Sequence, residues 1–304
     1  MELREIRTFL QVAHSNSFSR AAEELGYSQA AVTIQIRSLE QELETRLFDR
    51  IGKQTVLTHN GQVFYEYAAA ILKEVDCARA AVSGGKELTG RLCIGTIESI
   101  CAAIFPELLE AYHKAYPKVS VSIILNTPDV LLEHLGRNSI DLVYLLDRRI
   151  CDPRWKKVME EPEEIVFVSA ASHPAARALS LSLDEILTHP FILTEKDASY
   201  RFALDQYLAA AGKSLKPFLE IGNTEFIVNL VRSGMGLSFL PEYTVRKELE
   251  AQTLCALRVR DFQMHAWKQI LYHKDKWVTR EMAAFLELAN VFTDQVPPVE
   301  SPQV

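Results

Sequence analysis

Apolar residues recur at steps of three and four along residues 28–43, the spacing of a helix that buries one face. The apolar stripe consists of Val32, Ile36, Leu39 and Leu43. A second face, at about 100° per residue, carries Gln29, Thr33 and Arg37, with Ala30 and Ile34 beside them. An amide, a hydroxyl, a guanidinium and two exposed apolar groups are the kinds of group that read base edges, thymine methyls and phosphates in a DNA major groove. The second face is therefore a candidate DNA-reading surface.

A shorter helical pattern precedes this helix and leads into it through a tight turn. Its apolar positions are Phe18, Ala21, Ala22 and Leu25. Gly26 can adopt the left-handed conformation that ends a helix, and Ser28 is a favoured N-cap for the next one. A helix, a turn with glycine and a helix with an exposed polar face predict a helix-turn-helix.

The flanking segments complete a small N-terminal domain. Leu3–Ser15 is predicted to form a first helix that packs on the other two. Within Arg46–Thr58, Gly52 separates two short β-prone pieces, which predicts a β-hairpin wing. Arg50 and Lys53 near its tip could contact phosphates, which positions a protein on DNA without reading sequence. The alternative is a plain solvated turn.

A long helix is predicted next, from Thr58 as N-cap to Val82. Its apolar residues alternate in steps of four and three, the seam of a coiled coil. They are Phe64, Ala68, Ile71, Val75, Ala78 and Val82. The helix stands between two domains and ends at Ser83-Gly84-Gly85, which favours a dimerisation helix over packing against its own domain. A homodimer would present two recognition helices to a roughly palindromic DNA site.

Strands and helices alternate from Gly90 onward. The predicted strands are Arg91–Gly95, Val119–Leu125, Ile140–Leu146, Ile165–Ala170, Phe191–Thr194, Phe218–Ile221, one within Gly234–Leu240, and Lys268–Tyr272. The predicted helices are Ser99–Tyr116 (interrupted at Pro106), Asp129–Gly136, Ser182–Leu187, Tyr200–Ala211, Thr224–Ser233 and Thr279–Phe292. The βαβαβ order of the first three strands and the helices between them implies a parallel sheet with helices on both faces. The acidic run Glu160–Glu164 is interpreted as a solvated connector.

The net negative charge of the chain is unfavourable for DNA binding but does not exclude it. The chain has 33 Lys and Arg against 40 Asp and Glu, a net charge of −7. Residues 1–58 hold seven Lys and Arg and eight Asp and Glu, which gives −1. Because phosphate neutralisation supplies much of DNA affinity, we expect weak non-specific binding and a strong dependence on dimerisation.

Targeting and cysteine patterns favour a cytoplasmic protein. The N-terminus lacks the apolar segment of a signal peptide, and no apolar run reaches the roughly 18 residues of a membrane span. The five cysteines are scattered without C-x-x-C spacing. In a reducing compartment they are expected to be free thiols rather than disulfides or metal ligands.

Residues 17–50, SFSRAAEELGYSQAAVTIQIRSLEQELETRLFDR, resemble the N-terminal domain of LysR-type transcriptional regulators. The matching positions include Phe9, Ala13, Ser17, Phe18, Ala21, Ala22, Leu25, Ser28, Gln29, Val32, Gln35, Ile36, Leu39, Glu40, Leu43, Leu47, Phe48 and Arg50. The family usually has proline where this chain has Ala30, and a polar or basic residue where it has Ile34. Ile34 could touch a thymine methyl or could fill a polar position neutrally.

The resemblance extends over the effector domain of the family, because the segments Arg137–Leu145 and Leu230–Pro241 have sequences typical of that domain. It implies an α/β protein with an all-α N-terminal module: a winged helix-turn-helix, a long linker helix and a two-lobed, periplasmic-binding-protein-like effector domain. It also implies a small-molecule effector, a homotetramer and contact with RNA polymerase. The expected boundaries are 1–58 for the DNA-binding domain, 59–89 for the linker, 90–161 with 266–293 for lobe I, 162–265 for lobe II, and 294–304 for a disordered tail.

Candidate effector-binding residues follow the strands, because ligands of open α/β folds sit at the carboxyl ends of strands, against helix N-termini. They are Thr96, Glu98, Ser99, Asp147, Thr194, Ser199, Arg201 and Thr224. For each serine and threonine among them, the alternative to ligand contact is that the hydroxyl caps the N-terminus of its own helix. Two carboxylates, Glu98 and Asp147, would disfavour an anion unless Arg201 or Lys196 compensates, so we hypothesise an effector with an amino or other donor group. The alternative is that Glu98 is a first-turn helix charge and Asp147 a turn residue.

Catalytic patterns are absent from the sequence. No G-x-S-x-G or H-E-x-x-H occurs. Gly234-Met235-Gly236 follows a predicted helix and precedes a strand, the reverse of a dinucleotide loop. We therefore expect no enzymatic activity, no cofactor and no metal. The competing interpretation is a small-molecule-binding or enzymatic α/β protein whose N-terminal module serves only for assembly.

Overall fold

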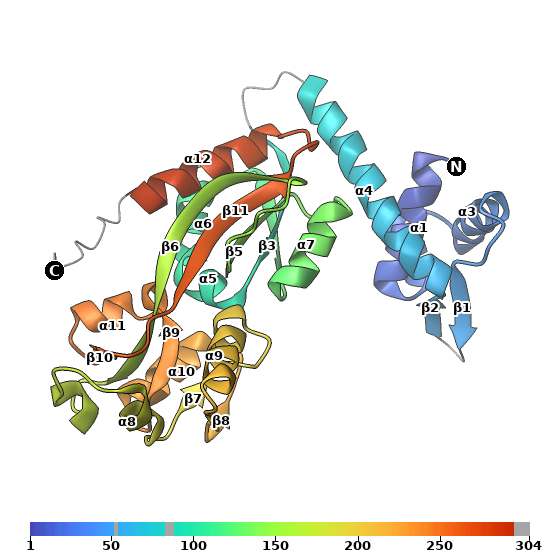
Figure 1. Ribbon diagram of the computed structural model, residues 1–304. Coiled ribbons are helices and arrows are strands. Elements are labelled where there is room, and N and C mark those ends of the chain that lie inside the picture. Colours follow the sequence, from blue (N-terminus) through green and yellow to red (C-terminus); the bar gives the residue numbers. More distant parts are fainter. Residues whose placement is uncertain (52–53, 83–87, 295–304) are drawn as a thin grey trace. The chain divides into compact units, whose positions relative to one another are not determined.

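The computed structural model describes residues 1–51, 54–82 and 88–294, which form an N-terminal unit and a larger C-terminal unit (Figure 1). The N-terminal unit consists of α1 (Leu3–Ser15), α2 (Phe18–Leu25), α3 (Gln29–Glu42), β1 (Phe48–Ile51), β2 (Gln54–Leu57) and α4 (His59–Val82). The predicted helix-turn-helix is confirmed, with its turn at Gly26, whose φ is 69°. The predicted cap at Ser28 is present, since its side chain accepts a hydrogen bond from the Ala31 N–H. Ser17 caps α2 in the same way, by accepting from the Arg20 N–H.

The three helices, the hairpin and the start of α4 share one apolar core. Phe9 of α1 is fully buried at its centre. Its ring lies 5.2 Å from that of Phe48 and 4.9 Å from that of Phe64, measured between ring centroids. Aromatic pairs at these separations contribute beyond their buried area. The wing and the long helix are therefore fixed to the same core as the helix-turn-helix.

The predicted wing is a two-stranded antiparallel hairpin. β1 pairs with β2 from Phe48↔Leu57 to Ile51↔Gln54. Lys53 and the side chain of Arg50, our two candidate phosphate contacts, lie outside the described residues. Their proposed role remains a prediction.

The predicted seam of α4 has a different partner over its first half. The N-cap is confirmed, because the Gly61 N–H donates to Thr58 Oγ1 at 2.9 Å. Phe64, Ala68 and Ile71, however, belong to the core of their own domain. The first half of the seam therefore packs against its own domain, which is the alternative that the sequence analysis disfavoured. A different stripe of α4 is exposed, with Val63 46% and Tyr67 62% accessible.

The C-terminal unit is built on a seven-stranded sheet. Its strands are β3 (Gly90–Thr96), β4 (Val119–Leu125), β5 (Leu142–Asp147), β6 (Trp155–Ala170), β9 (Ser238–Pro241), β10 (Leu254–Leu257) and β11 (His265–His273). The order is β10-β6-β11-β5-β3-β4, with β9 also paired to β6. β3 is parallel to β4 and β5, whereas β11 is antiparallel to β5 and β6. The parallel arrangement predicted for the first three strands is therefore confirmed. The whole sheet is mixed, because β11 returns antiparallel between β5 and β6.

The acidic run Glu160–Glu164 is part of β6, so its interpretation as a connector was wrong. Residues 155–164 of β6 pair with β11, and residues 165–170 pair with β9 and β10. One strand therefore passes from a first lobe, containing β3, β4 and β5, into a second. The buried Lys268 ammonium lies 3.3 Å from a carboxylate oxygen of Glu161 and 3.3 Å from one of Glu163. These partners lie more than 100 residues away along the chain.

Helices cover the two lobes (Figure 1). The first lobe has α5 (Glu98–Ala103), α6 (Phe105–Ala115), α7 (Pro128–Gly136) and α12 (Arg280–Asp294). The second has α8 (Leu183–Leu187), α9 (Ser199–Ala210), α10 (Thr224–Arg232) and α11 (Arg246–Glu250), with the short strands β7 (Ile192–Leu193) and β8 (Leu219–Glu220). The predicted interruption near Pro106 is present, since α5 ends at Ala103 and α6 begins at Phe105, with Pro106 in its first turn. Within the described ranges, no helix combines the length and the apolar character needed to cross a bilayer.

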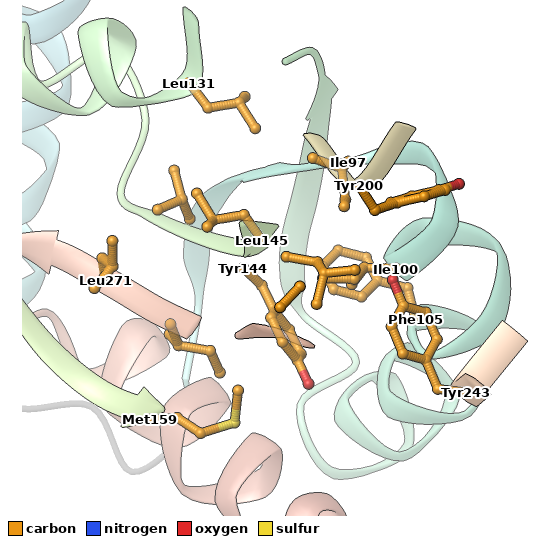
Figure 2. Close-up of a cluster of buried hydrophobic side chains, with 14 of the residues drawn as sticks. Ile97, Ile100, Phe105, Leu131, Tyr144, Leu145, Met159, Tyr200, Tyr243 and Leu271 are labelled. Atoms are coloured by element: carbon orange, nitrogen blue, oxygen red, sulfur yellow. The ribbon is translucent and has the colours of Figure 1, made fainter. Parts of the chain in front are cut away.

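One large buried cluster contains residues from both lobes. Figure 2 shows part of it, with Ile100 and Tyr144 of the first lobe and Tyr200 and Tyr243 of the second. A smaller cluster around Val168 and Ile227 belongs to the second lobe. The contact between the lobes is therefore apolar at its centre, and the polar groups described below lie at its edge.

Candidate functional site

The second face of α3 is exposed, as its sequence predicted. Val32, Ile36 and Leu39 are buried, with at most 2% of each accessible. The candidate reading residues Gln29, Ala30, Ile34 and Arg37 are exposed, and Thr33 is half-buried. The Thr33 hydroxyl donates to the Gln29 carbonyl oxygen at 2.9 Å, which leaves its oxygen able to accept.

Two side chains that our sequence reasoning did not single out fix α3 in place. The Thr8 hydroxyl of α1 donates to Gln35 Oε1 at 2.6 Å. Glu40 Oε1 accepts from the N–H groups of Leu47 and Phe48, at 2.8 and 3.2 Å. The Glu40 bonds tie the start of the wing to the end of α3. Gln35 and Glu40 match the family motif, but spacing alone did not predict these bonds.

A cavity of about 320 Å³ lies between the two lobes of the C-terminal unit. Its lining comes from the loops that follow β3, β4 and β7, and from the segment after β8. The lining residues are Ile97, Glu98, Ser99, Leu125, Asn126, Thr127, Pro128, Thr194, Glu195, Asp197, Ala198, Ser199, Tyr200 and Gly222. Four of our eight candidate effector residues are among them: Glu98, Ser99, Thr194 and Ser199.

Three of these candidates also hold the lobes together. The Glu98 carboxylate accepts from the Thr224 N–H at 3.0 Å and from the Thr224 hydroxyl. The Ser99 hydroxyl pairs with that of Tyr243 at 2.8 Å. The Ser199 hydroxyl donates to the carbonyl oxygen of Leu146 at 2.7 Å. Each bond joins one lobe to the other, so this edge of the cavity depends on their closed arrangement.

Three candidates do not line this cavity, and their polar atoms bond elsewhere. Thr96 is fully buried, and its hydroxyl donates to the Tyr144 carbonyl oxygen at 2.7 Å. Thr224 is taken by Glu98, as described above. Arg201 is 2% accessible and bonds the Thr194 carbonyl oxygen at 3.0 Å and the Asp205 carboxylate at 3.0 Å. Arg201 is therefore a structural cation of the second lobe, and its charge does not line the cavity.

Asp147 lines a neighbouring hollow of about 480 Å³ together with Arg148, Asp129 and Ser199. One of its carboxylate oxygens accepts from the Arg148 N–H at 2.8 Å. Burial is the main cause that raises the pKa of the Asp147 carboxyl above its usual range. The two predicted carboxylates, Glu98 and Asp147, therefore line different hollows.

Our sequence reasoning missed several lining residues. Asn126 and Thr127 follow β4 directly, so the same strand-end rule would have found them. Tyr200 gives the cavity a buried aromatic wall next to Ile97 (Figure 2). Gly222 leaves room for a carboxylate, because a Cβ there would overlap the Glu195 side chain. The close contact between Gly222 and the Glu195 side chain joins residues 27 positions apart, and the sequence does not indicate it.

Among the described residues, no cysteine lies on α3 or lines the cavity. No cluster of three or more His, Cys, Asp or Glu residues suited to a metal ion occurs in the described part of the chain. Cys93, Cys101, Cys151 and Cys255 do not form disulfides. The polar chemistry of the cavity is thus that of carboxylates, hydroxyls and backbone amides.

A helix-turn-helix with an exposed polar face, followed by a two-lobed α/β unit with a cavity between its lobes, defines a ligand-responsive DNA-binding protein. Residues 3–62 match the bacterial regulatory helix-turn-helix proteins of the lysR family, and residues 85–291 match the LysR substrate binding domain. The chain belongs to the LysR family of bacterial transcriptional regulators. It is a DNA-binding regulator with an effector-binding domain, and not an enzyme.

Similar proteins cover nearly the whole chain. An uncharacterised HTH-type transcriptional regulator of Bacillus subtilis, YwqM, is 32% identical over 95% of this chain and 99% of its own. The RuBisCO operon transcriptional regulator of Allochromatium vinosum is 29% identical over 94% and 95%. The crystal structure of full-length CbnR complexed with target DNA shares the fold, with a TM-score of 0.65 and 21% identity over 96% of this chain and 100% of CbnR.

Proposed function

We propose that this regulator reads its operator with the exposed face of α3, and that a small molecule in the cavity between the lobes changes that binding. The observation that carries the first part is the orientation of α3, whose apolar stripe is buried while Gln29, Ala30, Ile34 and Arg37 remain exposed. Amide and guanidinium groups at this spacing suit adenine and guanine edges. Thr33 and the wing residues Arg50 and Lys53 complete the proposed contact set.

A salt-dependent binding assay with Arg37→Ala tests this assignment. Loss of one cationic contact should weaken binding to duplex DNA about tenfold, in line with 1–3 kcal/mol for a good contact. Arg177→Ala is the matched control, because it removes the same charge from an exposed site in the C-terminal unit. If both variants bind DNA as the unmodified chain does, the α3 face is not the reading surface.

The proposed assembly is a homodimer through α4 and a homotetramer built from two dimers. The first half of the predicted seam is occupied by its own domain, so we assign the dimer contact to the exposed stripe with Val63 and Tyr67. Two reading helices on one dimer call for half-sites about one helical turn apart. We propose that this assembly acts on chromosomal DNA in the cytoplasm, in contact with RNA polymerase.

The effector half of the proposal depends on the cavity. Its volume of about 320 Å³ is at the lower end of small-molecule sites. Because residues of both lobes line it, a ligand that prefers one lobe arrangement shifts the population toward that arrangement. The DNA-binding units would then change their spacing, which alters operator affinity.

A further inference from the structure

The cavity between the lobes has an unbalanced charge, and this bears on the class of effector that it accepts. Glu98, Glu195 and Asp197 line it, while no lysine, arginine or histidine is among its lining residues in the described ranges. The Glu98 carboxylate is held by Thr224, so Glu195 and Asp197 are the exposed carboxylates. A ligand with two negative charges would meet only carboxylates at this edge, which costs binding energy.

A different edge of the same cavity offers hydrogen-bond donors. The first turn of α9 lines it through Ser199 and Tyr200, with Ala198 as the N-cap. Alanine has no side-chain acceptor, and the Ser199 hydroxyl is turned to the Leu146 carbonyl oxygen. The start of this 12-residue helix is therefore not capped by a side chain. Its first N–H groups and the helix dipole favour an anionic group there.

A buried hydroxyl supplies a second, independent indication of a ligand. Thr194 lines the cavity and is 4% accessible, yet its Oγ1 has no partner with hydrogen-bond geometry among the described groups. The Tyr200 hydroxyl lies near the Thr194 hydroxyl. Burial raises the pKa of Tyr200, and the nearby hydroxyls of Thr194 and Thr224 partly oppose that rise. Because a buried polar atom without a partner is costly, a bound ligand group would satisfy Thr194.

We propose that this cavity takes a small zwitterion of the α-amino acid class, with its carboxylate at the start of α9 and the Thr194 hydroxyl, and its ammonium group at Glu195 and Asp197. This inference rests on the proposed effector site. It names the class of effector and excludes simple dicarboxylates. The apolar wall of Ile97 and Tyr200 would face the ligand's side chain. The volume of about 320 Å³ restricts the ligand to a small molecule.

The first test measures ligand binding by the full-length protein, by thermal shift and then by calorimetry. The probes are the twenty standard amino acids, the 2-oxo acids that lack the ammonium group, the amides that lack the carboxylate, and succinate as a plain dianion. At least one amino acid should bind, and its 2-oxo acid and amide should each bind at least tenfold more weakly. Equal or tighter binding of the 2-oxo acid or of succinate overturns the proposal, as does the absence of binding by all twenty amino acids.

Substitutions in the cavity lining test whether the amino acid binds in this cavity. Thr194→Val loses no protein hydrogen bond, so it should fold normally and weaken binding several-fold. Asp197→Asn should weaken binding about tenfold. Glu287→Gln, at an exposed carboxylate of α12, is the control and should bind as the unmodified chain does. If Thr194→Val and Asp197→Asn both bind normally, the ligand is not held as proposed.

The same variants separate this inference from the effector site itself. If succinate binds and Thr194→Val weakens that binding, the cavity is an effector site but the ligand class is wrong. If some ligand binds and none of the cavity variants affects it, the effector site lies elsewhere. DNA binding, measured in parallel on each variant without ligand, should be unchanged and reports on α3 independently.

Discussion

Asp147, the last residue of β5, carries a carboxyl whose pKa is raised chiefly by burial. A raised pKa in the folded state means that the charged form destabilises the fold. This cost is fully present above the folded-state pKa and vanishes below the unfolded-state value of about 3.9. Asp147→Asn should therefore raise the thermal midpoint near neutral pH, and the gain should disappear as pH falls to about 3.5.

Thermal unfolding of both proteins across this pH range provides the check. Asparagine keeps an oxygen for the Arg148 N–H, so the backbone bond is retained. Asp197→Asn, at an exposed carboxylate, is the control and should show little change in the midpoint. A gain for Asp147→Asn that stays constant with pH would contradict the burial argument.

Ile34 is 66% accessible, which is unusual for a large apolar side chain on a helix surface. We predict that it contacts a thymine methyl, so that Ile34→Ala weakens operator binding several-fold. Replacing the contacted thymine by uracil removes the methyl group, and the two changes should not be additive. An unchanged operator affinity and sequence preference for Ile34→Ala would mean that the side chain fills its position neutrally.

At the scale of elements, the join between wing and linker depends on Gly61 of α4. A Cβ at Gly61 would overlap the Leu47 carbonyl oxygen, which already accepts from the Thr58 N–H at 3.0 Å. Because this neighbour is backbone, it cannot move aside cheaply, and Gly61→Ala should destabilise the protein by about 1–3 kcal/mol.

Chemical denaturation of the full chain measures this change. Gln62→Ala, at an exposed polar site on the same helix, is the control, and should change stability by less than about 0.5 kcal/mol. If Gly61→Ala were as stable as the unmodified chain, α4 would not approach the wing as closely as the structure shows.

Elements whose signals are local could be predicted from the sequence, and those that depend on distant partners could not. The bounds of α2 follow from an apolar spacing, from Ser17 as N-cap and from Gly26, all within ten residues. The acidic run in β6 was misread because Lys268, which lies beside Glu161 and Glu163, is more than 100 residues away.

The cavity shows the same division between local and distant information. The strand-end rule found Glu98, Ser99, Thr194 and Ser199, because it depends only on the order of elements. It also selected Arg201, although Asp205 stands four residues later on α9, a spacing that indicates a pair within one helix. Chain order alone could not show that the Thr96 hydroxyl bonds the Tyr144 carbonyl oxygen.

At the scale of the whole molecule, assembly should depend on the exposed stripe of α4. Tyr67→Glu places a charge in the proposed dimer contact and should shift the protein toward smaller species in analytical ultracentrifugation. Gln62→Glu introduces the same charge at an exposed polar site of α4 and should leave assembly intact. If Tyr67→Glu assembles as the unmodified chain does, this stripe is not the dimer contact.

The most direct test of the central claim, that a dimer reads DNA with the α3 face, is selection of duplexes from a random pool by the full-length protein. We predict an enriched, roughly palindromic site with half-sites about one helical turn apart. Gln29→Ala should lose the preference at one position in each half-site while it keeps the rest. An enriched site without two-fold symmetry, or an identical preference for Gln29→Ala, would contradict the account.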